Sequence, residues 1–125
     1  MSNSIDIIKI VSDLPSRPRG RACILLTKDF LGQKEWAREL AKQTNSEYID
    51  LLEIFSLDSD LSETIGQFTV SELFVLLSNY NNYNVLVVTG LEFLKATWTG
   101  LSNALTQFLS QVSTWDKTPC LFFVM

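Results

Sequence analysis

Gly32, Gln33 and Lys34 lie where an apolar run gives way to an amphipathic one, and their types suit contact with an anion. Residues 22–27 form a short apolar run that is typical of a strand buried on both faces. Residues 33–44 place apolar side chains along one face of a helix. A strand, a short loop that contains glycine and a helix form the layout that binds phosphate at a helix N-terminus. The stretch therefore predicts a strand–loop–helix unit with a candidate anion site.

The loop departs from the pattern of a working phosphate loop, Gly-x-x-x-x-Gly-Lys-Ser/Thr. Aligned on Gly32, the pattern places its first glycine on Thr27, its lysine on Gln33 and its hydroxyl residue on Lys34. Gln33 carries no charge, and Lys34 lies one step further along the helix, a rotation of about 100°. Lys28 begins the loop and is long enough to reach an anion. Three interpretations stay open: a plain strand-to-helix turn, a weak or altered nucleotide site, and another kind of anion site.

Two further groups of side chains are candidates for contact with a partner. Arg17, Arg19 and Arg21 form the one basic cluster, which is either a solvated loop or a contact for phosphate or an acidic partner. Trp98 lies between two threonines and is a candidate anchor for a protein partner. Trp36, on the amphipathic helix, is predicted to belong to the core.

Composition excludes several classes of site. The 125 residues, 46% of them hydrophobic, predict one domain with a sizeable core. No histidine is present, so Ser-His and Cys-His nucleophiles and histidine metal sites are excluded. Cys23 and Cys120 are too few for a structural zinc site or a disulfide framework, and we expect buried thiols in neighbouring strands. The sequence lacks the features of a signal peptide and a long apolar run, which predicts a cytoplasmic protein without a membrane span.

The net charge of −4 is unevenly distributed along the chain. Residues 1–42 carry +3 and residues 43–125 carry −7. Such a dipolar surface suits a docking protein and does not favour broad nucleic-acid binding. Nucleic acid is therefore expected to make contact only through a partner or through the Arg17–Arg21 loop.

Periodicity and turn signals predict the other elements. Helices are expected at residues 4–14, 33–44, 59–66, 70–79 and 100–114, and strands at 22–27, 48–52, 85–88 and 120–125. Thr69 and Glu72 have the spacing of a capping box. Strands that alternate with helices predict an α/β fold, in which helices cover both faces of a parallel sheet and make three layers.

Apolar positions in these elements define a predicted core. In the first helix, the apolar stripe is expected to consist of Ile5, Ile8 and Val11. The strands at 85–88 and 120–125 are expected to supply the central core residues, which are Leu86, Val88, Leu121 and Phe123.

Residues 25–33 and 85–92 together resemble the two nucleotide motifs of P-loop NTPases of the AAA+ type. In the second motif an apolar strand ends in Asp, often with Glu nearby. The small P-loop protein of BREX-type phage-defence systems is similar in its spacing of elements. The resemblance implies a single P-loop NTPase-like domain over residues 1–125, with strand order 2-3-4-1 and sites at the carboxyl ends of the strands.

The resemblance also implies which parts of an ATPase are altered. Thr89 stands at the position of the magnesium-linked Asp, and a hydroxyl cannot supply that charge. Glu92 is a candidate for the residue that polarises water, or is simply an exposed or helix-capping residue. The fifth strand, the lid and the arginine finger of such enzymes are not found in the sequence, so the core is a truncated one. Metal ligands are not expected from this sequence, and ATP with Mg²⁺ is a possible ligand only at the altered nucleotide site.

Two functions from different classes follow. One is a non-catalytic pseudo-ATPase that serves as an interaction subunit of a bacterial multiprotein assembly, in phage defence or DNA metabolism. The other is a nucleotide-binding protein with weak or partner-dependent hydrolysis, using Lys28, Gly32, Gln33, Lys34 and Thr89. Because strand one would be an apolar edge strand without charge or proline, we also expect it to be covered by the N-terminal helix, by a second copy or by a partner strand.

Overall fold

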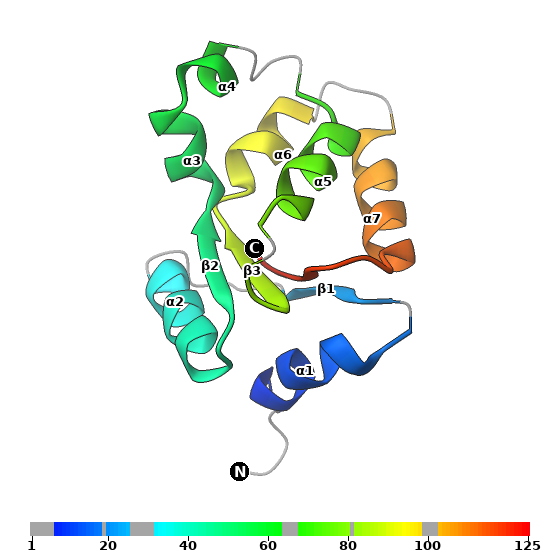
Figure 1. Cartoon of the computed structure of the whole chain (residues 1–125). Coiled ribbons are helices and arrows are strands. Elements are labelled where there is room, and N and C mark those ends of the chain that lie inside the picture. Colours follow the sequence, from blue (N-terminus) through cyan, green and yellow to red (C-terminus); the bar gives the residue numbers. More distant parts are fainter. Residues whose placement is uncertain (1–6, 19, 26–31, 64–67, 81, 99–102) are drawn as a thin grey trace.

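The computed structural model describes residues 7–18, 20–25, 32–63, 68–80, 82–98 and 103–125. Within these ranges four parallel strands form one sheet, and helices lie on both of its faces (Figure 1). The predicted α/β class with three layers therefore agrees with the structure. In chain order the elements are α1 (Ile7–Asp13), the 3-10 turn η1 (Leu14–Ser16), β1 (Ala22–Leu25), α2 (Gln33–Gln43), β2 (Glu47–Asp50), α3 (Leu51–Leu57), α4 (Ser59–Glu63), α5 (Val70–Ser78), β3 (Val85–Thr89), α6 (Glu92–Trp98), α7 (Ala104–Thr114) and β4 (Cys120–Val124).

The strands lie in the order β1-β4-β3-β2. Read from the opposite edge, this order is 2-3-4-1. Ala22, Leu121, Leu86 and Glu47 are level with one another across the sheet. The edges of the described sheet are consequently β1 and β2, and the central strands are β3 and β4.

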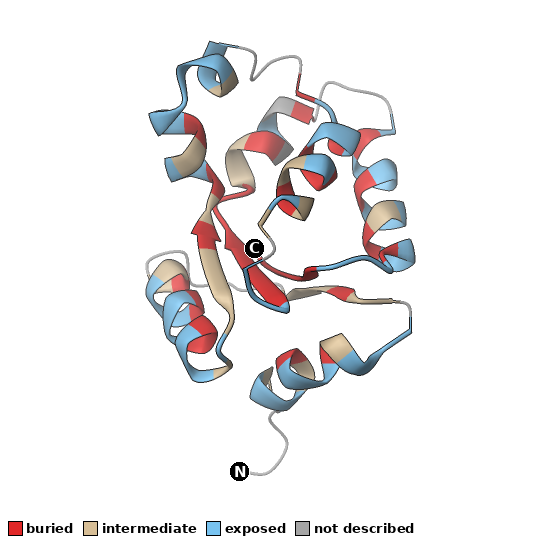
Figure 2. Ribbon diagram, in the orientation of Figure 1, coloured by how far each residue is buried: buried red, intermediate tan, exposed pale blue. Residues whose placement is uncertain are grey.

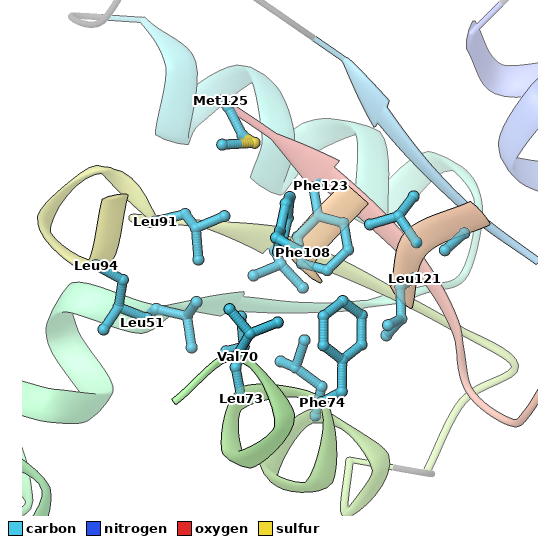
Figure 3. Packing of buried hydrophobic residues seen from close by; sticks show 14 of the residues in the cluster. Leu51, Val70, Leu73, Phe74, Leu91, Leu94, Phe108, Leu121, Phe123 and Met125 are labelled. Atoms are coloured by element: carbon cyan, nitrogen blue, oxygen red, sulfur yellow. The ribbon is translucent and has the colours of Figure 1, made fainter. Parts of the chain in front are cut away.

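Two hydrophobic clusters hold the layers together. One, on what we call the α5–α7 face, packs α3, α5, α6 and α7 against one side of the sheet (Figure 3). The other, on the α1–α2 face, packs α1 and α2 against the other side. Burial concentrates in β3, β4 and the inward sides of the helices (Figure 2). The predicted core residues Leu86, Val88, Leu121 and Phe123 are all fully buried in the first cluster, which confirms that prediction.

The first helix faces the sheet with a different stripe from the predicted one. Val11 and Leu14 are buried, whereas Ile8 is 44% exposed. Ile7 and Ile10 also pack against the sheet. The helix is therefore amphipathic, as predicted, but its buried side is rotated so that Ile7, and not Ile8, faces the sheet. Ile5 lies outside the described residues.

Trp36 was assigned to the core, and this is wrong, because its side chain is 41% exposed. Small and medium residues, Ala37, Leu40 and Ala41, fill the contact between α2 and the sheet. The helix ends at Gln43, one residue before its predicted end, with Thr44 as its C-cap, and Asn45 follows with a left-handed φ of 54°.

Two short helices, α3 and α6, were not predicted, and the second strand is shorter than expected. Asp50 ends β2, and its side chain accepts a hydrogen bond from the Leu52 backbone N–H, so Leu51 begins α3 instead of continuing the strand. Helix α4 covers Ser59–Glu63, and the rest of the helix predicted at 59–66 lies outside the described residues. Leu57 is 81% exposed. The capping box of Thr69 and Glu72 is present as predicted.

Helix α7 begins at Ala104, and the residues from 99 to 102, including Leu101 of the predicted stripe, lie outside the described residues. Phe108 and Val112 are buried as expected, whereas Leu105 is 57% exposed. None of the described helices has the length and apolar character that a membrane crossing would need.

Replacing Phe123 should be among the most destabilising changes. Phe123 is fully buried and packs edge-on against Phe74 and Phe108. We expect Phe123→Ala to lower the free energy of unfolding by about 3–5 kcal/mol, the range for large-to-small core substitutions. The matched control is Leu57→Ala, which should change it by less than about 0.5 kcal/mol because Leu57 is on the surface. Equal effects in urea denaturation would contradict this packing.

The two thiols should differ in reactivity. Cys120 is fully buried, as predicted, but Cys23 is only partly buried in the neighbouring strand. Burial raises the pKa of Cys23 to about 11, against a smaller lowering by Arg17. Because the thiolate is the reactive form, labelling of native Cys23 should accelerate about tenfold per pH unit between pH 7 and 9. Cys120 should label only on unfolding, and single-cysteine variants separate the two rates.

Candidate functional site

Polar side chains gather where β2 and β3 end. Asp50 and Thr89 are partners in the register of these two strands. Tyr48 lies two residues before Asp50 and therefore on the same side of the sheet. Lys34, in the first turn of α2, approaches this edge from the α1–α2 face. We call Lys34, Tyr48, Asp50, Thr89 and Glu92 the carboxyl-edge cluster.

The strongest contact in the cluster is an ion pair between Lys34 and Asp50. The Lys34 Nζ and Asp50 Oδ2 atoms are 2.7 Å apart, with side-chain exposures of 42% and 11%. The hydrogen bond to Asp50 raises the pKa of Lys34, burial opposes this, and the charges of Asp50, Tyr48 and Glu92 add to the increase. Lys34 is thus a cation that two carboxylates stabilise, one of them by direct contact.

Asp50 performs a second task in the same place. Its Oδ1 atom accepts a hydrogen bond from the Leu52 N–H at 3.1 Å and so caps α3. The two carboxylate oxygens therefore divide between Lys34 and the first turn of α3. This side chain joins the start of α2, the end of β2 and the start of α3.

Thr89 is fully buried, and its hydroxyl is engaged within the protein. The Tyr48 and Thr89 hydroxyl oxygens are 2.8 Å apart, and Thr89 also donates to the Ile49 carbonyl at 3.4 Å. The guanidinium of Arg38 lies over the Tyr48 ring, 5.2 Å from its centroid. Thr89 was predicted as a nucleotide contact, but its place in the structure is that of a core hydroxyl between two strands.

Gly90 allows this close arrangement. Its φ is +76°, a left-handed conformation that favours glycine. A Cβ atom at this position would lie 2.0 Å from Asp50 Oδ1 and 2.9 Å from the Leu52 backbone nitrogen. Only a residue without a side chain lets the end of β3 pass so close to the capping carboxylate.

Glu92 opens α6 at the same edge of the sheet. Within the described part of the chain its Oε2 atom is buried and has no hydrogen-bond partner. Its charge acts on Lys34. The charges of two carboxylates, Asp50 and Glu92, thus act on one lysine, which makes the edge unfavourable for a polyanion.

The candidate loop residues are placed as follows. Gly32 precedes α2 as its N-cap, with a φ of −96°, so no left-handed conformation requires glycine there. Gln33 is buried, at 5% exposure, and makes its own contacts inside the protein. Lys28 lies outside the described residues. The structure thus brings Lys34, Thr89 and Glu92 to one edge, with Lys34 in contact with Asp50 and Thr89 in contact with Tyr48.

Trp98 was predicted as an anchor for a partner, and this is wrong. It is 4% exposed, and its indole Nε1 donates to the Phe68 carbonyl at 2.9 Å. Trp98 ends α6, a helix that periodicity did not reveal, and packs near Phe108 with ring centroids 6.2 Å apart. A large aromatic ring in such a position stabilises the core.

The arginine cluster stabilises its own loop. Arg17 donates to the Gly20 carbonyl at 3.3 Å, and Arg21 donates to the Pro15 carbonyl at 3.2 Å. Arg17 is exposed, Arg21 is partly buried, and Arg19 lies outside the described residues. Contact of this loop with an acidic partner stays a prediction.

Sequence reasoning missed Tyr48, Asp50 and Gly90 as members of the site. Asp50 was predicted only as part of the strand at 48–52, whereas in the structure it ends β2 and caps α3. A signal was available, because Asp50 directly precedes an apolar helical segment and Gly90 directly follows a buried strand.

Comparison of the chain with protein-family models, with curated proteins and with solved structures finds no match.

Substitution of Gly90 tests the packing of this edge. Gly20 also has a left-handed φ, +65°, but a Cβ there would meet nothing within 4 Å. Gly20→Ala should therefore cost only the left-handed strain, about 1–2 kcal/mol. Gly90→Ala should lower the unfolding free energy by about 1–3 kcal/mol more, because it adds a clash with Asp50. Equal losses in the two variants would show that Asp50 does not pack against Gly90.

Proposed function

We propose that this chain is a non-catalytic interaction subunit built on a degenerate P-loop-like core. The observation that supports it is the Lys34–Asp50 ion pair at 2.7 Å. The lysine nearest to the candidate nucleotide position is engaged by a carboxylate that also caps α3. Binding a phosphate through Lys34 would cost both the ion pair and part of this local arrangement.

The chemistry of phosphoryl transfer supports the same proposal. That reaction depends on positive charge and metal ions placed around the phosphate oxygens. Here Asp50 and Glu92 both act on Lys34. Thr89, at the position of the magnesium-linked Asp, directs its hydroxyl to Tyr48. The cluster is better suited to stabilising the edge of the sheet than to holding a triphosphate.

Exposed apolar side chains support the interaction role. Those on the α5–α7 face belong to α3, α5 and α7, and they are Leu52, Leu57, Val75, Leu105 and Leu109, each between 46% and 81% exposed. Exposed apolar side chains bind other proteins when they form a contiguous patch. The setting that the resemblance implies is a bacterial multiprotein assembly in phage defence or DNA metabolism, with either a partner protein or a second copy.

One observation favours the second function, nucleotide binding with weak or partner-dependent hydrolysis. The Lys34 side chain is 42% exposed despite its ion pair, so an anion in solution can reach it. In that case Glu92, at the same edge, would be the candidate to polarise water, and Asp50 would compete with the phosphate for the lysine.

Calorimetric titration with ATP and Mg²⁺ distinguishes the two functions. We expect no saturable binding with a dissociation constant below about 1 mM, that is, less than about 4 kcal/mol of binding free energy. Lys34→Ala should change the titration no more than the control Lys42→Ala, which removes an exposed lysine elsewhere on α2. Micromolar binding that is lost in Lys34→Ala but kept in Lys42→Ala would reject the non-catalytic proposal and favour the alternative.

A further inference from the structure

We propose that the open edge of β2 binds an extended peptide segment of a partner, with basic side chains toward Glu47 and Glu53 and an acidic side chain toward Arg38. This inference rests on the proposed interaction function and names the kind of partner. Strand addition at a sheet edge gains main-chain hydrogen bonds, while alternate side chains supply specificity.

The edge of β2 is shaped as a groove. β2 pairs with β3 on one side and is the last described strand of the sheet. In Figure 1 it stands at the left, with α2 below it and α3 above it. A pocket of about 290 Å³ lies along this edge, with Arg38 and Tyr48 among its lining residues on one side and Glu53, Ile54 and Tyr80 on the other.

The two walls belong to different faces of the sheet. Ile49 is part of the cluster on the α5–α7 face, whereas Tyr48 packs against the α1–α2 face. Since side chains alternate along a strand, Glu47 shares the face of Ile49. Side chains of a strand added beside β2 would alternate in the same way, so that successive side chains would face the two walls in turn.

The two walls of the groove carry charges of opposite sign, and a bound strand whose side chains alternate in charge would complement both walls. On the α5–α7 face, the Glu47 Oε1 atom is buried and, within the described residues, has no hydrogen-bond partner. The charge of Glu47 acts on Tyr80, which lines the pocket beside Glu53. On the α1–α2 face, Arg38 lies over the Tyr48 ring, and the charge of Asp50, which also lines the pocket, is paired with that of Lys34. A basic, acidic, basic alternation would thus oppose Glu47, Arg38 and Glu53 in turn.

The charges also argue against a second copy as the occupant. Two β2 strands that paired antiparallel about a twofold axis would keep the same side chains on the same face of the sheet. Glu47 and Glu53 of both copies would then lie on one face, and like charges gathered across strands are unfavourable. The other described edge, β1, reads Ala-Cys-Ile-Leu and offers no charge to either wall. A partner segment with its own alternating charges is the better complement.

The experiment uses two blocked peptides of the same composition, both palindromic so that strand direction does not matter. Thr-Val-Lys-Glu-Lys-Val-Thr places lysines on one face and glutamate on the other, whereas Thr-Lys-Val-Glu-Val-Lys-Thr places all three on one face. We expect the first to bind the full chain about tenfold more tightly by fluorescence anisotropy, because each cross-strand charge pair is worth a factor of about two to five. Hydrogen exchange of residues 47–50 should slow when this peptide is bound.

Single substitutions in the protein test which side chains produce the preference for the first peptide. Glu47→Gln and Arg38→Gln should each reduce the preference for the first peptide by a factor of about two to five, while Glu35→Gln, on the exposed side of α2, should leave it unchanged. Equal affinity for the two peptides, no binding of either, or slowed exchange of residues 47–50 with rising protein concentration alone would overturn the proposal. None of these outcomes bears on the titration with ATP, so the two proposals fail separately.

Discussion

Strands β3 and β4 are buried on both faces, and the placement of the helices follows from this burial. Every residue of these two strands is buried. A parallel pair of this kind must be covered by helices on each side, because its side chains point alternately into two separate clusters. The α5–α7 face receives Leu86, Val88, Leu121 and Phe123, and the α1–α2 face receives Val85, Val87, Phe122 and Val124. The edge strands β1 and β2, each of which pairs with one strand among the described residues, are less buried and carry the polar and reactive side chains.

The carboxyl-edge cluster follows from this arrangement. Parallel strands end at the same edge, so Asp50 and Thr89 meet there although they are 39 positions apart in the sequence. Asp50 contacts Lys34, caps α3 and lies against Gly90, and each of these contacts limits the others. A side chain with three neighbours of this kind is costly to displace, and this supports a structural role for the cluster over the binding of a triphosphate.

The open edge of β2 and the carboxyl-edge cluster are two parts of one strand. Tyr48 and Asp50 point toward α2 and make the contacts with Thr89 and Lys34, while the backbone edge of the same residues lies along the groove. The internal ion pair neutralises Asp50 and leaves Glu47 and Glu53 as the acids of that edge. The proposed interaction edge and the ion pair that engages Lys34 thus belong to the same short strand.

Elements with local signals were predictable from the amino-acid sequence. Unbroken apolar runs gave the positions of β3 and β4, the spacing of Thr69 and Glu72 gave the start of α5, and alternation of strands and helices gave the α/β class. Tertiary structure decided which faces those elements presented. Trp36 and Ile8 are exposed and Trp98 is buried because the neighbouring helices, and not hydrophobicity, set the contact. The pairing of Lys34 with Asp50 was likewise decided by the fold, since a carboxylate 16 positions away comes within 2.7 Å only when β2 lies beside β3 and α2 packs beneath them.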